Sequence, residues 1–302
     1  MKYAIYKFDF SAGVHFGTGM LNDTVYTFQA DMLFSALYIE ALKLGKADQF
    51  YEWTYSGKLL FSDSFPFVGD TYMLPKPMLY VETVNRGDSE EKKYYKNLKF
   101  LPVEQMEDFL KGKLNRHEDL MKEFGRFQYQ TMAIVRQSEE TTPFFVGTYY
   151  YSSGNGVYII VRYEDEVQKQ LMEELLEALS YTGIGGKKSS GLGKFTLMPG
   201  RQIETLCEYL QKKSERYMLL SVALPRDNEL ENALDGASYL LSKRSGFITS
   251  DHYAEEFRKK RDLYVFSAGS CFKNTFEGDI YDVSKGGRHS VFRYARSLFM
   301  GV

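Results

Sequence analysis

The apolar residues at the start of the chain follow two different periods in turn. Residues 3–10 alternate apolar and polar side chains, which is the pattern of a half-buried β-strand. Residues 31–45 then repeat apolar side chains at helical spacing, and this predicts a helix that Asp31 caps and Gly45 ends. Two more strands are predicted at residues 58–62 and 72–81, in a region punctuated by proline and glycine.

The stretch from residue 82 to about residue 136 is charged and aperiodic, with a short helix predicted after Pro102. We interpret it as an insertion. Regular patterns return with strands at residues 131–136, 144–151 and 157–163. The last two strands are predicted to form a hairpin, in which Gly154 supplies the positive φ that a tight turn needs.

A second amphipathic helix follows these strands. Its apolar face is predicted to hold Val167, Leu171, Leu175 and Leu179, and Gly183 lies just past its end. A strand at residues 194–198 completes the order β-α-β-β-α-β. This order predicts a ferredoxin-like (RRM-type) domain over residues 1–199, with the insertion at about residues 82–136.

Residues 200–302 repeat part of this order after the Pro199-Gly200 boundary. Strands are predicted at residues 217–224, 239–243 and 263–267, and a short helix at residues 228–234. The predicted fold class is therefore α+β, with tandem ferredoxin-like (RRM-type) domains. The first contains an inserted thumb-like region, and the second is smaller and degenerate.

Composition excludes several classes of protein. Hydrophobic residues make up 44% and charged residues 26%, a globular balance, and no apolar run is long enough for a membrane span or a signal peptide. We therefore expect a cytoplasmic protein with no membrane contact. Cys207 and Cys271 lie far apart without a metal-binding or redox spacing, so we expect buried, reduced thiols, no metal and no cofactor.

The net charge of -2 does not suggest nucleic-acid binding, but the basic residues are clustered. One cluster lies between Glu177 and Glu204, where no acidic residue occurs, and a second follows Asp282. Aromatic residues reach 16%, which suits both a β-rich core and base stacking, and core packing must explain most of them.

Residues 183–194 form the most informative segment, in which five glycines are interleaved with lysine and serine. Glycine lets backbone amides approach a ligand closely, while lysine adds charge and serine adds donors, so a phosphodiester backbone fits this chemistry. A P-loop or Rossmann loop would precede its helix, whereas this loop follows one. The alternative is a loop that only connects the helix to the next strand.

With the helix before it and the strand after it, this loop resembles the glycine-rich loop of the RAMP superfamily of CRISPR proteins. Residues 14–17, 31–37 and 288–302 resemble one branch, the subunit that caps the 5′ end of the guide in type III-A (Csm) interference complexes. The resemblance implies recognition of the 5′ handle of the crRNA, with target RNA nearby, and no nuclease activity. It also implies docking of the large polymerase-like subunit onto the backbone subunits, and a thumb-like hairpin within residues 82–136.

The residues expected to contact RNA are His15, Phe16, Gly17, Gly183, Gly185, Gly186, Lys187, Lys188, Ser189, Ser190, Gly191, Gly193, Lys194, Arg288 and Arg293. The C-terminal arginines could instead contact protein or lie on the solvated face of an edge strand. Two rival functions stay open. One is a metal-independent endoribonuclease that processes crRNA with His15 as acid or base, and the other is a purely protein-binding scaffold.

Overall fold

The computed structural model describes residues 1–82, 93, 95–114, 119–134, 142–248, 250, 252–254 and 258–302. The α-helices are α1 (Ala30–Lys43), α2 (Ala47–Tyr55), α4 (Met106–Leu110), α5 (Glu166–Thr182), α6 (Glu204–Gln211) and α7 (Asp227–Leu234), and the 3-10 helices are η1 (Val103–Gln105) and η2 (Lys188–Ser190). The strands before η2 are β1 (Lys2–Asp9), β2 (Leu59–Phe61), β3 (Phe65–Val68), β4 (Thr71–Pro75), β5 (Phe100–Pro102), β6 (Gly125–Ile134), β7 (Thr142–Tyr151) and β8 (Asn155–Tyr163). The later strands are β9 (Thr196–Pro199), β10 (Tyr217–Leu219), β11 (Leu241–Arg244), β12 (Leu263–Phe266), β13 (Cys271–Phe272), β14 (Gly278–Asp282), β15 (Phe292–Arg296) and β16 (Phe299–Gly301).

The largest sheet has seven strands in the order β5-β4-β3-β8-β1-β9, with β2 pairing to β8 beside β3. The pairings β1–β8, β1–β9 and β3–β8 are all antiparallel. Helix α1 follows β1, and helix α5 lies between β8 and β9, as predicted. Between α1 and β8 the chain forms α2, α4 and the strands β2 to β7, more elements than the predicted order contains. The fold is thus mixed α and β with antiparallel sheets, as predicted.

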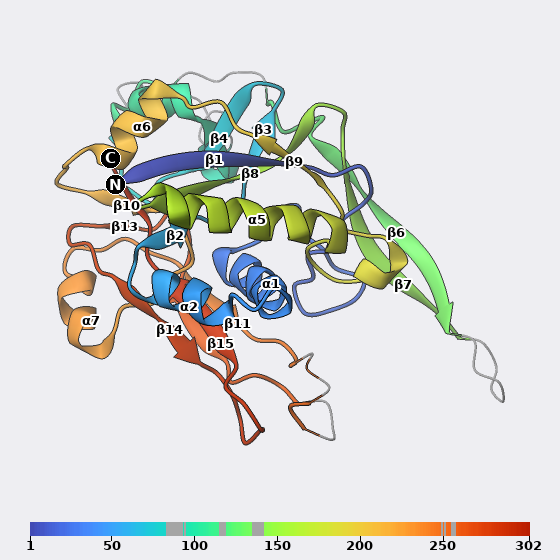
Figure 1. Cartoon of the computed structure of the whole chain (residues 1–302). Helices are drawn as coiled ribbons and strands as arrows, with labels where there is room; N and C mark the ends of the chain where they lie inside the picture. Colours follow the sequence, from blue (N-terminus) through green and yellow to red (C-terminus); the bar gives the residue numbers. More distant parts are fainter. Residues whose placement is uncertain are drawn as a thin grey trace.

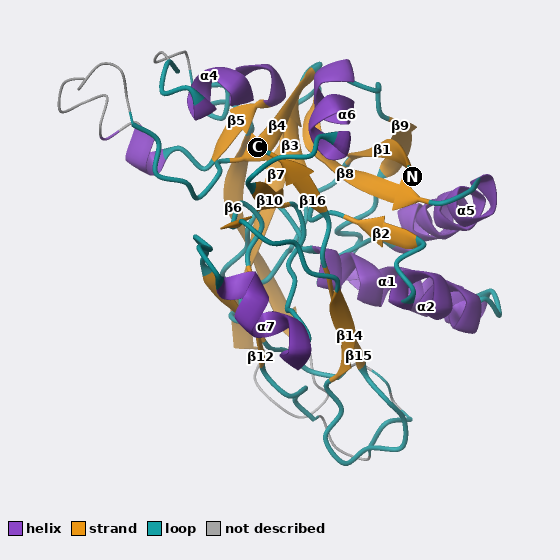
Figure 2. Ribbon diagram, turned by 90° about the vertical axis from the view of Figure 1, so that its left-hand side faces the viewer, coloured by secondary structure: helices purple, strands orange, loops and turns teal. Residues whose placement is uncertain are grey.

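Strand β8 is the centre of this sheet and is buried on both faces. Val157, Ile159 and Val161 belong to one hydrophobic core, and Tyr158 and Ile160 belong to the other. Helices α1, α2 and α5 cover the first face, while α6 lies on the opposite side of the sheet (Figures 1 and 2). Because side chains alternate across a strand, this distribution requires a layer on each side.

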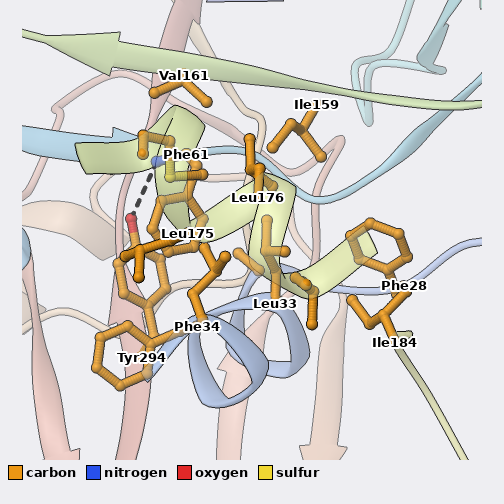
Figure 3. Close-up of a cluster of buried hydrophobic side chains, with 14 of the residues drawn as sticks. Phe28, Leu33, Phe34, Phe61, Ile159, Val161, Leu175, Leu176, Ile184 and Tyr294 are labelled. Carbon is orange, nitrogen blue, oxygen red and sulfur yellow. Dashed lines mark hydrogen bonds between the residues drawn. The ribbon is translucent and has the colours of Figure 1, made fainter. Parts of the chain in front are cut away.

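The C-terminal third contributes to both cores. Tyr294 of β15 stacks on Phe61 with ring centroids 4.6 Å apart, and its hydroxyl accepts a hydrogen bond from the Phe61 N–H at 3.4 Å (Figure 3). On the other face, Met218 and Met300, from β10 and β16, pack in the second core. Residues after 200 therefore share their hydrophobic cores with residues before 199.

Several small sheets make up this C-terminal part. Strands β13, β10 and β16 form a three-stranded antiparallel sheet, and β11–β12 and β14–β15 form two-stranded ladders. Helix α7 confirms the helix predicted at residues 228–234. No helix of the described residues is long and apolar enough to cross a membrane.

Asp31 does not cap helix α1, and this corrects the sequence interpretation. Gln29 is the N-cap, and the fully buried Asp31 carboxylate lies inside the first turn, where it binds Arg244 at 2.8 Å and Arg293 at 2.5 Å. Burial opposes ionisation of Asp31, but the two guanidinium groups outweigh it and hold the pKa of this carboxyl below its usual range. The Ala30 N–H donates instead to Asp63, at 2.8 Å.

Strand β7 pairs with β6 along its whole length, so the predicted hairpin between residues 144–151 and 157–163 is wrong. No ladder of the described chain joins β7 to β8, although Gly154 does have the predicted positive φ of 81° in the turn between them. Helix α5 was predicted correctly, but Val167 is exposed while Leu171, Leu175 and Leu179 are buried. Of the predicted insertion, residues 83–92, 94, 115–118 and 135–136 lie outside the described residues.

The buried Asp63 carboxyl generates a testable pH dependence of stability. Its Oδ1 also accepts a hydrogen bond from the Val222 N–H at 2.9 Å, and burial raises its pKa to about 7. Between about pH 4 and pH 7 the unfolded chain releases this proton while the folded chain keeps it, so the free energy of unfolding should fall as pH rises. Asp63→Asn keeps the acceptor oxygen but cannot ionise. The thermal midpoint of this variant should therefore not fall between pH 4 and pH 7 as that of the unaltered protein does.

The exposed Asp70 provides the control, since Asp70→Asn removes an ordinary surface carboxylate. This variant should follow the unaltered protein across the same pH range. Parallel pH curves for Asp63→Asn and the unaltered protein would show that folding does not raise the pKa of Asp63.

Candidate nucleic-acid interface

The glycine-rich loop begins where helix α5 ends. Gly183, at φ 80°, donates its N–H to the Leu179 carbonyl at 2.7 Å, and the Ile184 N–H then donates to the Gly193 carbonyl at 2.9 Å. This second bond closes the loop at its base. The side chains of Ile184 and Leu192 are buried at this base. Residues 185–191, which include the short helix η2, form the rest of the loop.

Two glycines of the loop are required by close packing. A Cβ on Gly185 would lie 2.7 Å from the His15 carbonyl oxygen, and one on Gly193 would overlap the Ile184 carbonyl oxygen. Both also have positive φ, at 99° and 77°. A side chain on Gly185 would push the loop away from its support, and one on Gly193 would displace Ile184 at the base of the loop, so both glycines serve the shape of the loop.

That support is the segment from Gly13 to Gly17. The Gly193 N–H donates to the Gly13 carbonyl at 3.0 Å, and the Gly186 N–H donates to the His15 carbonyl at 2.8 Å. On its other side, Val14 exchanges two backbone hydrogen bonds with Tyr149 of β7, at 2.8 and 2.9 Å. The segment therefore lies between the glycine-rich loop and strand β7 and binds both.

The imidazole of His15 ties the same elements together. Its Nδ1 lies 2.7 Å from the carbonyl oxygen of Gly147 in β7, and only 6% of the residue surface is exposed. No described side chain forms a hydrogen bond or an ion pair with this ring.

Strands β6 and β7 form a long hairpin that projects from the body of the protein, with the glycine-rich loop (yellow) alongside strand β7 (Figure 1). The Lys187 Nζ lies 4.9 Å from the ring centroid of Phe144 on β7, so a lysine of the loop contacts the hairpin directly. The outward face carries Phe127, Tyr129 and Phe145, all exposed. Tyr129 meets Phe127 at 4.9 Å and Phe145 at 6.3 Å between centroids, both edge to face.

The glycine-rich loop carries three lysines and no acidic residue. Within the described chain, no carboxylate lies within ion-pair distance of Lys187, Lys188 or Lys194. The N–H groups of residues 187–189 donate no hydrogen bond to any described residue. Lys187 holds φ 58°, the only positive φ of a non-glycine residue in the described chain. Together these features leave amides and ammonium groups available to an anion.

Most of the predicted RNA-binding residues converge here, from His15 and Gly17 through the whole of residues 183–194. Phe16 is corrected, because its ring is fully buried against Phe10 and Phe28 and offers no surface to a base. Arg293 is corrected too, because it is 6% exposed and its guanidinium binds Asp31. Arg288 is exposed but belongs to another loop, where its N–H donates to the Tyr253 carbonyl at 3.1 Å.

Sequence reasoning missed the exposed aromatic face of the hairpin. Alternating aromatic and polar residues from Phe127 to Thr131 gave a strand signal, but it lay within the stretch interpreted as an insertion. The tip of the hairpin, residues 135–141, lies outside the described residues.

Metal chemistry has no structural support in the described part of the chain, which contains no group of His, Cys, Asp and Glu side chains placed to hold an ion. Both cysteines are unpaired thiols. Burial raises the pKa of Cys271 to about 12, which keeps this thiol protonated and inert.

Gly191 and Gly193 form a matched pair for testing the loop. Both have positive φ, at 85° and 77°, but a Cβ on Gly191 would meet nothing within 4 Å. Gly191→Ala should lower the free energy of unfolding by about 1–2 kcal/mol, because alanine is strained at positive φ. Gly193→Ala should lower it further, because its Cβ also displaces Ile184. Thermal unfolding and amide exchange of residues 184–194 would measure the difference, and equal costs would contradict the packing role of Gly193.

The sequence of this chain is similar to those of a known protein family. The model of the CRISPR Csm4 C-terminal domain matches residues 212–302. A protein described as "CRISPR system Cms protein Csm4" from Streptococcus thermophilus is 36% identical over 308 residues, covering 99% of this chain and 98% of the relative. Its counterpart from Mycobacterium tuberculosis (strain ATCC 25618 / H37Rv) is 35% identical over 305 residues, covering 100% and 98%.

Solved structures agree on the fold. A chain of the Csm3-Csm4 subcomplex of a type III-A CRISPR-Cas interference complex superposes with a TM-score of 0.67 at 16% identity, covering 100% of this chain and 99% of that one. A chain of a Csm1-Csm4 cassette in complex with cA4 gives a TM-score of 0.64 at 20% identity, covering 100% and 98%. On the full-length sequence identity to these relatives, the chain belongs to the Csm4 family of CRISPR proteins.

Proposed function

We propose that this chain is the non-catalytic subunit of a type III-A CRISPR interference complex that binds the 5′ handle of the crRNA. The observation that carries the proposal is the position of the glycine-rich loop beside the β6–β7 hairpin, with both bound to residues 13–17. Together the two elements combine phosphate-binding groups with exposed aromatic rings. That combination suits single-stranded RNA.

The glycine-rich loop supplies the grip on the backbone. The free amides of residues 187–189 lie beside three lysines without a described acidic partner, and Ser189 and Ser190 add exposed hydroxyl donors. Such a cluster of donors and positive charge suits phosphate oxygens. These contacts fix the position of the RNA and carry no base preference.

The hairpin supplies the stacking surface. Phe127, Tyr129 and Phe145 form a row of edge-to-face rings on the hairpin face that points away from Phe144 and Lys187. RNA held at the loop would reach this row by crossing the edge of the hairpin. Stacking on such rings tolerates any base. The thumb-like hairpin was expected within residues 82–136; we propose that it is β6–β7, of which only β6 lies within those bounds and β7 lies beyond them.

Protein partners follow from the same family. The names of the solved structures describe Csm4 together with Csm3 and with Csm1, and we propose that this chain likewise links backbone subunits to the large subunit. The C-terminal part has exposed apolar side chains that a protein partner could cover. Leu241 and Tyr264 of the β11–β12 ladder are examples. We also propose that this part is a degenerate ferredoxin-like domain, since β10 lies between β13 and β16 and is followed by α7.

The absence of catalysis is part of the proposal. His15 directs Nδ1 at the Gly147 carbonyl, and no described acid or base faces the ring, which argues against the crRNA-processing reading. A purely protein-binding scaffold would leave the lysines and amides of the loop without a role.

Removing the loop lysines tests the grip on phosphate. The double variant Lys187→Ala/Lys188→Ala should bind handle RNA more weakly, and the slope of log K against log salt should flatten by about 1.4 because two phosphate contacts are lost. Fluorescence anisotropy of labelled handle RNA over a salt series would measure both effects. Gel analysis of the same samples should show intact RNA.

The double variant Lys212→Ala/Lys213→Ala is the matched control. It removes two adjacent exposed lysines next to α6, on the opposite side of the sheet from α5 (Figure 1), and should leave the slope unchanged. An unchanged slope in the Lys187/Lys188 variant would argue for the scaffold reading. Cleaved RNA in the presence of a chelator would favour the nuclease reading.

The stacking surface predicts a second effect with a different signature. Tyr129→Ala should weaken RNA binding by about 1–3 kcal/mol without altering the salt slope, because stacking neutralises no phosphate. Thr131→Ala on the same exposed face is the control and should bind normally. Equal affinity for the Tyr129 variant and the control would place the RNA elsewhere.

A further inference from the structure

The His15 ring has a defined protonation pattern. Its Nδ1 faces the Gly147 carbonyl oxygen at 2.7 Å, and a carbonyl can only accept a hydrogen bond. Nδ1 must therefore carry the proton and donate it. In the neutral ring this leaves Nε2 as a lone-pair acceptor.

Nothing in the described chain donates to that acceptor. Only 6% of the residue surface is exposed, and no described donor bonds to Nε2. Nε2 is not among the fully buried polar atoms without a partner, so it keeps contact with solvent. A ligand hydroxyl that reaches Nε2 can donate a hydrogen bond to it in place of water.

Two glycines keep the edge of the imidazole uncovered. A Cβ on Gly17 would lie 3.0 Å from Nε2, and one on Gly186 would lie 2.7 Å from Cδ2. Neither glycine has a positive φ, so neither is needed for its backbone conformation. Their shared property is the missing side chain over His15, and Gly17 is itself exposed. The Nε2–Cδ2 edge of the imidazole therefore has no side chain of residue 17 or 186 over it; we refer to this gap between Gly17 and Gly186 as the opening.

The chemistry of this opening selects its ligand. Phosphate oxygens only accept hydrogen bonds, so they cannot bind a neutral Nε2. A ribose 2′-hydroxyl can donate, is absent from DNA, and recurs at every nucleotide next to the phosphates. The opening adjoins Gly186, one residue from the free amides and lysines of the loop.

We propose that His15 Nε2 accepts a hydrogen bond from a ribose 2′-hydroxyl of the bound RNA, through the opening between Gly17 and Gly186. His15 is then a residue that distinguishes RNA from DNA. This inference rests on the proposed function, since it needs RNA on the glycine-rich loop.

The test is a coupling measurement between His15 and single 2′-hydroxyl groups. His15→Asn keeps a side-chain N–H near the position of Nδ1, so it can still donate to Gly147, but it has no atom at Nε2. Affinities of the full chain would be measured for all-ribose handle RNA and for copies with one 2′-deoxy substitution at each position. At one position the unaltered chain should lose about 3- to 10-fold in affinity, and His15→Asn should show no further loss.

Gly17→Ala closes the opening while keeping His15, so it should also abolish the effect of that single 2′-deoxy substitution. Met20→Ala, a change of an exposed side chain in the same loop, should preserve it. If His15→Asn weakens binding equally for every 2′-deoxy RNA, the 2′-hydroxyl contact is wrong although RNA binding stands. If the unaltered chain does not bind the handle RNA, both the proposed function and this inference are overturned.

Discussion

Strand β8 is apolar on both faces, and the rest of the architecture follows from the need to cover both. Every residue from Val157 to Val161 is fully buried. Burial of a large aliphatic or aromatic side chain contributes about 1.5–3 kcal/mol, so an uncovered face would leave the sheet unstable. Helices α1 and α5 cover one face, and the other is completed by α6 with strands from the C-terminal third. The C-terminal residues are thus part of the fold that carries the loop.

The same sheet explains why three distant segments form one surface. Strand β1 ends at Asp9, β9 begins beside it at Thr196, and β8 begins opposite Phe8, so all three meet at one end of the sheet. The segment after β1 carries His15, the loop before β9 carries the lysines, and the strand before β8 is β7 of the hairpin. Antiparallel pairing therefore brings residues 13–17, the glycine-rich loop and β7 to the same end of the sheet. The backbone hydrogen bonds of residues 13–17 then hold the loop and β7 together.

Local patterns predicted the parts of the fold whose determinants are close in sequence. Helix α5 has its capping residues, its apolar positions and its terminal glycine within 20 residues. The glycine-rich loop is recognisable from its composition alone. The partner of Arg293 lies 262 residues away at Asp31, so a basic side chain near the end of the chain gave no sign of being buried. Phe16 resembled a stacking residue for the same reason, because its neighbours Phe10 and Phe28 become a core only after folding.

Helix α2 escaped notice for a related cause, since only Ala47, Phe50 and Thr54 are buried and the rest of its short sequence is polar or aromatic. The pairing of β7 with β6 instead of β8 could not be read from Gly154, because a turn glycine fixes a change of direction and not a partner. Register and partner choice depend on which faces other elements bury. Those elements include helices from both halves of the chain.

The charge balance constrains how the proposed surface would bind RNA. With a net charge of -2 the chain cannot rely on long-range attraction, and the lysines of the loop give only a local field. Amide donors, stacked rings and a buried imidazole act only at contact distance and depend little on salt. Affinity built from such contacts requires the groups to be positioned before the RNA arrives. The fixed glycine geometry and the attachment of loop and hairpin to residues 13–17 would provide that positioning for the proposed RNA ligand.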